Sequence, residues 1–151
     1  MPDIPVGKVE LKHGALNGAS DWLGVTVRGK GAHAAYPSAG IDAIMIAAKV
    51  VDALHTVVSR NVSPLQEAVL TLGTIQGGAR NNIIADEVSM TGTIRTTDPQ
   101  VRAEVAERVR AIVSGIPAAL GGSGEAQIVA GYSALSNHAW VVDLIAEEAL
   151  H

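Results

Sequence analysis

The sequence has no cysteine and no phenylalanine, and aromatic residues make up only 3% of its 151 positions. Without thiols the chain can form neither a disulfide framework nor a thiolate metal site. No apolar run approaches the ~18 residues of a transmembrane helix, and the first residues lack a signal-peptide pattern. These absences lead us to expect a cytoplasmic protein that does not associate with membranes.

Charge is also sparse, and its sign is informative. Charged residues contribute 17% of the chain, and the formal net charge is −4. A mildly acidic chain argues against a nucleic-acid-binding surface or a basic membrane-binding face. Hydrophobic residues make up 48%, which is enough for the core of about one domain. With so few aromatics, that core must consist of Ala, Val, Ile and Leu.

Apolar periodicity predicts a regular order of elements. Alternating residues indicate strands over 21–28, 69–76, 88–95 and 126–130, and a short additional strand over 8–11. Spacings of three and four predict helices over 42–59, 98–117 and 139–150. From residue 20 onward the order is strand, helix, strand, strand, helix, strand. This order favours an α+β, ferredoxin-like fold with a four-stranded antiparallel sheet, strand order 4-1-3-2, and two helices on one face.

The helix predicted over 42–59 has two surfaces of interest. Its apolar stripe, which we expect to be buried, consists of Ile44, Ala48, Val51, Leu54 and Val58. Ala43 and Ala47 lie outside this stripe, so we expect them to form a small-residue face that packs against a second copy of the chain.

Three residues are candidates for chemistry, and each also has an ordinary explanation. None of the five histidines belongs to a metal-binding motif, but His33 lies among small residues in a loop that leaves its ring accessible. Asn82 ends a glycine-rich loop, where asparagine is also a common turn residue. Arg95 ends a strand, where arginine is usually solvated but is also suited to binding a carboxylate.

Three motifs place these residues in a recognisable pattern. They are Gly-Ala-His-Ala-Ala-Tyr-Pro at 31–37, Gly-Gly-x-x-x-Asn-x-Ile-x-Asp at 77–86, and Gly-Thr-Ile-Arg-Thr-x-Asp-Pro at 92–99. Together, over roughly residues 4–135, the chain resembles the lid or dimerisation domain of the aminoacylase, hippurate hydrolase and carboxypeptidase family of dinuclear metallohydrolases.

The resemblance implies a division of the chain and a missing partner domain. Residues 20–135 would be the lid, and 1–19 and 136–151 would be stubs of a catalytic domain that the chain lacks. That domain would hold two divalent metals, usually zinc, and metal-activated water would hydrolyse an N-acyl amino acid or a related amide. The present chain would hold no metal and would be inactive alone.

The resemblance also implies roles for the three candidates. His33 would stabilise the developing oxyanion of the tetrahedral intermediate, from the partner subunit. Arg95 would hold the free carboxylate of the substrate, and Asn82 would be a further polar contact.

The expected topology independently favours a homodimer. His33 and Asn82 fall at one end of the sheet. Arg95 falls at the other, roughly 25 Å away at ~3.3 Å per residue, together with the two linkers, which leave the lid at Ser20 and Ser133. One chain therefore cannot direct all three side chains at one small substrate. A twofold homodimer can, if edge strand 69–76 pairs with its symmetry mate and helix 42–59 packs beside it.

A second class of function remains open at this point. A non-enzymatic ferredoxin-like module that binds a small ligand, or regulates through dimerisation, would explain the fold and the acidic charge but not the three motifs. An RNA-binding version is weaker, because the central strands lack the aromatic residues that stack on bases.

Overall fold

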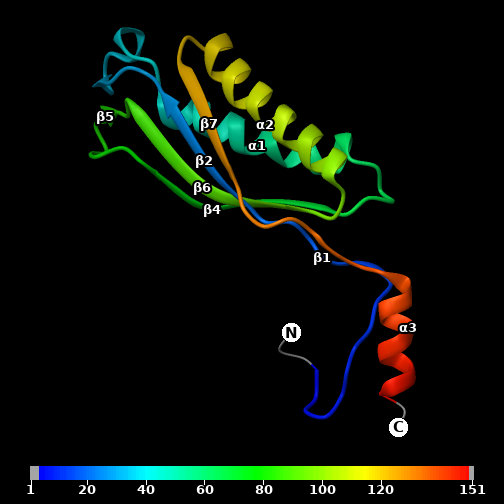
Figure 1. Cartoon of the computed structure of the whole chain (residues 1–151). Coiled ribbons are helices and arrows are strands. Elements are labelled where there is room, and N and C mark those ends of the chain that lie inside the picture. Colours follow the sequence, from blue (N-terminus) through cyan, green and yellow to red (C-terminus); the bar gives the residue numbers. More distant parts are fainter. Residues whose placement is uncertain (1–3, 150–151) are drawn as a thin grey trace.

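The computed structural model describes residues 4–149, and a four-stranded antiparallel sheet is its main element (Figure 1). The strands are β2 (Asp21–Arg28), β4 (Ala68–Gly77), β6 (Glu87–Thr96) and β7 (Ser123–Ala130). Their order across the sheet is β4-β6-β2-β7. Numbered along the chain, the strands lie in the order 2-3-1-4, which is 4-1-3-2 from the opposite edge. The α+β class is confirmed.

Two helices, α1 (Ala43–Asn61) and α2 (Pro99–Ala119), cover one face of this sheet (Figure 1). Both begin after an aspartate cap. Asp42 Oδ1 accepts from the Ile44 and Met45 N–H groups, and Asp98 Oδ1 accepts in the same way from residues 100 and 101. These bonds satisfy N–H groups that have no partner inside the helix.

The expected end of α2 at Pro117 is wrong by two residues. Pro117 lies buried inside the last turns, and the helix ends at Ala119. A proline cannot donate to the carbonyl four residues earlier, which belongs to Val113. Gly124 of β7 fits closely against that carbonyl, and any Cβ at Gly124 would lie 2.0 Å from it. The sheet thus fills the space beside the interrupted turn.

The expected core face of α1 is right only in part, because the helix carries two adjacent apolar faces, and Val51 and Val58 of the expected stripe are only partly buried against the core. The residues buried against the sheet are Ala43, Ile46, Ala47, Val50, Leu54 and Val57. Ala43 and Ala47 are therefore core residues and cannot form a contact with a second copy. Of the expected stripe, Leu54 is buried, whereas Ile44 is 50% exposed. Periodicity alone could not tell which of two neighbouring apolar faces meets the sheet.

We call the second face of α1 the edge stripe: Ile44, Ala48, Val51 and Val58. It lies beside β4, the outer strand. Near one end, the Ile44 Cδ1 atom is 3.3 Å from the position of a Cβ built on Gly78, which follows β4. Near the other end, Val58 and residues 68–70 of β4 line the same cavity of about 280 Å³.

The expected strand over 8–11 is wrong, and a different segment forms a strand there. β1 (Gly14–Asn17) pairs antiparallel with β8 (Leu135–Asn137). This two-stranded ribbon leads away from the main sheet to α3 (Ala139–Glu148) (Figure 1). Val9 is largely exposed, because the alternating residues of 8–11 have no sheet to pack on. None of the helices in residues 4–149 is long and apolar enough to cross a membrane.

Asp21 fastens the point where both linkers leave the sheet. It is the first residue of β2, on the buried face, and is only 5% exposed. Its carboxylate forms an ion pair with Arg102 of α2, with Nε to Oδ2 at 2.8 Å, and accepts from the Gly131 N–H at 3.1 Å. The hydrogen bond from Arg102 is the main cause that lowers the pKa of Asp21, against the opposing effect of burial.

We expect Asp21→Asn to lower the free energy of unfolding by about 2–3 kcal/mol at neutral pH, because a buried charge-assisted hydrogen bond is lost. The pKa of Asp21 is lowered in the folded state, so its contribution is present above the ordinary aspartate value of about 3.9 and is lost as pH falls through the folded value. The difference between wild type and variant should therefore shrink in acid. Urea unfolding across this pH range measures it.

Asp52→Asn is the matched control, since Asp52 is an exposed aspartate on α1. It should change stability by no more than about 0.5 kcal/mol. Equal losses in the two variants would contradict the assigned role of Asp21.

Candidate functional site

The loops that carry His33 and Asn82 meet at the short strand β5 (Ile83–Ile84), which lies at the end of the sheet away from the linkers (Figure 1). β3 (Ala32–His33) pairs antiparallel with β5 (Ile83–Ile84), and His33 is directly opposite Ile83. The Ala34 N–H donates to the Asn82 carbonyl at 2.9 Å. The loop that carries His33 and the loop that carries Asn82 are therefore joined by their backbones.

The imidazole of His33 has a defined donor atom. The Ala35 N–H donates to His33 Nδ1 at 3.1 Å. Because Nδ1 accepts this bond, the neutral ring carries its proton on Nε2, which can donate to a ligand. The Tyr36 ring lies at a tilt of 56°, with its centroid 6.0 Å from that of His33. The side chain is exposed and oriented, as a hydrogen-bond donor to an external group requires.

Glycines let the His33 loop fold back on the start of α1. Lys30 and Ile41 exchange two backbone hydrogen bonds of 2.8 Å across the loop. Gly29 precedes this bridge, and a Cβ there would lie 2.1 Å from the Ile41 carbonyl oxygen. A Cβ at Gly40 would lie 2.8 Å from the Lys30 carbonyl oxygen. A side chain at either position would push the loop away and displace His33.

Arg95 lies at the opposite end, on the face of the sheet that no helix covers. It pairs with Val69 of β4 and is exposed. Its Nη1 donates to the hydroxyl of Tyr132 at 3.3 Å. This hydrogen bond connects strand β6 with the second linker. A cavity of about 460 Å³ opens beside it, lined by residues 66–69 and 95–97 together with Gly18. This volume can accommodate part of a small molecule.

The structure does not bring all three candidates together. β2, with eight residues, runs between the two ends. At ~3.3 Å per residue it separates them by roughly 25 Å. His33 and Asn82 are neighbours, whereas Arg95 belongs to a different place on the same chain.

Sequence reasoning missed Asp21, Arg102 and Tyr132. The sequence does contain a signal for Asp21. Asp21 falls on the same side of the alternating strand as Leu23, so its carboxylate is expected on the buried face of β2. A buried carboxylate needs a hydrogen-bonding partner. Nothing in the sequence signals the Tyr132 contact, because it depends on how the linker bends after β7.

Metal ligands do not gather anywhere in the described residues. Across residues 4–149 there is no group of three or more His, Cys, Asp or Glu side chains that could hold an ion. His13 meets a single carboxylate, Asp143, at 2.8 Å. The residues present therefore do not fit a dinuclear centre.

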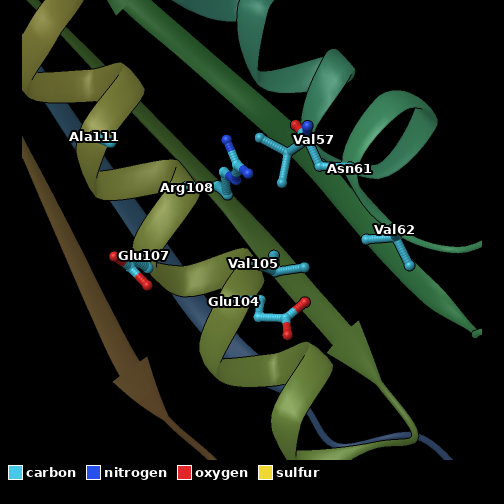
Figure 2. A pocket seen from close by; sticks show the side chains of 8 residues that line it. All are labelled: Val57, Asn61, Val62, Glu104, Val105, Glu107, Arg108 and Ala111. Carbon is cyan, nitrogen blue, oxygen red and sulfur yellow. The ribbon is translucent and has the colours of Figure 1, made fainter.

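A second cavity lies on the helical layer, away from His33, Asn82 and Arg95. Figure 2 shows it between α1 and α2, with Arg108 and Glu104 projecting from α2 toward the end of α1. Its volume is about 270 Å³. It contains none of the candidate residues.

A comparison with known proteins identifies the family to which the chain belongs. A model described as the peptidase dimerisation domain matches residues 17–119. The N-acetyl-L-cysteine deacetylase of Bacillus subtilis (strain 168) is 44% identical over 148 residues, which cover 98% of this chain and 36% of that protein. The N-acetyldiaminopimelate deacetylase of Priestia megaterium is 46% identical over 115 residues, covering 76% and 31%.

Crystal structures agree with the same assignment. The Bacillus subtilis protein YXEP, a dinuclear metal-binding peptidase of the M20 family, superposes with a TM-score of 0.76 at 27% identity, covering 99% of this chain and 36% of that chain. A protein from methicillin-resistant Staphylococcus aureus superposes with a TM-score of 0.91 at 28% identity, covering 97% and 39%. This chain spans little more than a third of the length of these proteins.

We expect the 151-residue chain to bind no stoichiometric divalent metal, because its described residues offer no cluster of ligands. Elemental analysis after dialysis against zinc measures this. About two tightly held ions per chain would contradict the placement of the metal centre outside this chain.

Proposed function

Because this chain belongs to the peptidase dimerisation domain family of the M20 metallohydrolases, we propose that it is the lid and dimerisation domain of a longer metal-dependent amidohydrolase. Residues 20–135 form the lid. Residues 1–19 and 136–151 belong to a catalytic domain that contains the divalent metals and their ligands. The 151-residue chain alone is inactive, since it supplies only part of the site.

Two observations support the proposed substrate class. Two relatives are named for the deacetylation of N-acetylated amino acids. An arginine with an exposed fork, such as Arg95, suits the free carboxylate of such a substrate. The proposed reaction is therefore hydrolysis of an N-acyl amino acid or a related amide.

His33 and Asn82 contact the reacting end of the substrate. The proton on His33 Nε2 is available to a developing oxyanion, and a donor that is already oriented pays little reorganisation during the reaction. Asn82 is held beside His33 through the backbone bond to Ala34, and its amide is exposed for a polar contact.

The observation that carries the proposal is the strand length between His33 and Arg95. A single substrate can meet both residues only if they come from different chains. β4 is an edge strand with ten residues and a free row of backbone groups. Antiparallel pairing of β4 with its symmetry mate places the His33 end of one subunit beside the Arg95 end of the other.

The edge stripe supports the same interface. Ile44 on α1 and Ile75 on β4 are 50% and 59% exposed. Ile75 is opposite the buried Met90, so it lies on the helix side of the sheet, next to the edge stripe. Helix α1 and strand β4 thus present one continuous apolar surface that a second copy would cover.

We expect Ile44→Glu to weaken self-association of the chain by roughly 100-fold or more, because a twofold interface brings two like charges into one apolar contact. Sedimentation equilibrium measures the dissociation constant. Leu120→Glu is the matched control, since Leu120 is 42% exposed and lies at the end of α2. Equal association of the two variants would exclude the edge stripe from the interface.

In the full-length enzyme, His33→Ala and Arg95→Ala should each abolish most activity, and a mixture of the two dead variants should recover part of it. Loss of an oxyanion donor costs ~10²–10³-fold in rate. In a mixed dimer one site receives both defects and the other receives neither. Random exchange yields about half mixed dimers, and hence about a quarter of wild-type activity.

The control for this mixture is verified subunit exchange, for example by mass spectrometry of labelled subunits. If both residues serve the site of their own chain, every site carries one defect and no activity returns. A fully exchanged mixture that stays inactive would overturn the shared site.

A further inference from the structure

Tyr132 is held firmly at the place where the second linker leaves β7. The Ser20 N–H donates to the Tyr132 carbonyl oxygen at 3.1 Å, and the neighbouring Gly131 N–H donates to Asp21 Oδ1 at 3.1 Å. A Cβ on Gly131 would lie 2.1 Å from the Ser20 carbonyl oxygen, so the two linkers cross in close contact. These two hydrogen bonds therefore fix the backbone from which the Tyr132 side chain projects.

From this position the phenol reaches Arg95, where its oxygen accepts from Nη1 at 3.3 Å. We propose that Tyr132 is a positioning residue, which holds the Arg95 guanidinium in place to receive the carboxylate of the substrate. The proposal rests on the function proposed above for Arg95. It adds a residue outside the three motifs.

The geometry of a guanidinium makes this arrangement productive. The phenol uses one Nη1 hydrogen. The edge formed by Nε–H and Nη2–H is left for a carboxylate, which it can bind through two parallel hydrogen bonds. A long arginine side chain at a solvated strand end would otherwise lose rotamer freedom when it binds its ligand. With the phenol in place, much of that ordering has occurred before binding.

The environment of the phenol fits this role. The hydrogen bond from Arg95 is the largest cause that lowers the pKa of Tyr132, followed by a hydrogen bond with Ser20. Both donate to the phenol oxygen and so stabilise its ionised form, in agreement with the phenol acting as the acceptor in the contact with Arg95. Val69, the cross-strand partner of Arg95, and Glu67 line the adjoining cavity, so the ligand would approach from that side.

The test is a double-mutant cycle in the full-length enzyme with Tyr132→Phe, Arg95→Ala and both together. The substrates are an N-acetyl amino acid that wild type hydrolyses and the carboxamide of the same compound. Tyr132→Phe should raise KM for the carboxylate substrate roughly 3- to 10-fold and leave kcat nearly unchanged, as expected for loss of one neutral hydrogen bond that acts on binding. KM for the carboxamide should not change.

On the Arg95→Ala background, Tyr132→Phe should have no further effect, because the phenol acts through the arginine. A general structural role would instead lower activity equally on both substrates and on both backgrounds, and would overturn the proposal. So would an unchanged KM for Tyr132→Phe in an enzyme whose Arg95→Ala variant is defective. An unaltered KM in Arg95→Ala itself would overturn the function proposed for Arg95 as well.

A direct measurement of the contact uses the 151-residue chain, which contains two tyrosines. Tyr36→Phe leaves Tyr132 as the single phenol, and its ionisation is followed by ultraviolet absorbance. The pKa should lie below the ordinary tyrosine value and rise when Arg95→Ala is added. An ordinary pKa that Arg95→Ala does not alter would show that the contact does not form, and would overturn the proposal without touching the role of Arg95.

Discussion

The length of one strand governs how this chain can act. β2 and its neighbours run antiparallel, so the His33 loop emerges at one end of the sheet and Arg95 with both linkers at the other. No rotation of side chains can bridge a gap of roughly 25 Å. His33 and Arg95 therefore lie at two separate places on one chain. Under the proposed function, a second copy of the chain is what brings such residues to one substrate.

Helix α1 carries a core face and, in the proposed dimer, an interface face. Its buried residues close the hydrophobic core over β2 and β6, while the edge stripe extends the apolar surface past β4. An apolar surface this wide on a surface helix is costly to leave in water, since each exposed aliphatic group forfeits its transfer free energy. The unpaired backbone of β4 lies alongside it. In the proposed dimer, the edge of a second sheet would cover both features.

The sequence predicts most of the helices and strands, but not which face of helix α1 is buried. Alternation in β2 and β6 and the apolar spacing of α1 and α2 predict element bounds to within one or two residues, because both patterns are local. The core face of α1 could not be predicted in this way, since its neighbours in space decide which apolar stripe is buried. The three motifs name His33, Asn82 and Arg95 as candidates from the sequence, and their roles stay predictions. The Arg95 to Tyr132 contact could not, because it depends on the path of a linker.

The linkers give His33 and Arg95 different mechanical surroundings. His33 lies on a loop braced by the pairing of β3 with β5, at the end of the sheet away from the linkers. Arg95 and Tyr132 lie beside the crossing of the linkers, which Asp21 and Arg102 tie to α2. In the proposed dimer, a change in the angle between the lid and its own catalytic domain would shift the phenol and the guanidinium together. The carboxylate would stay in register with the catalytic domain, while the oxyanion donor would arrive with the partner subunit.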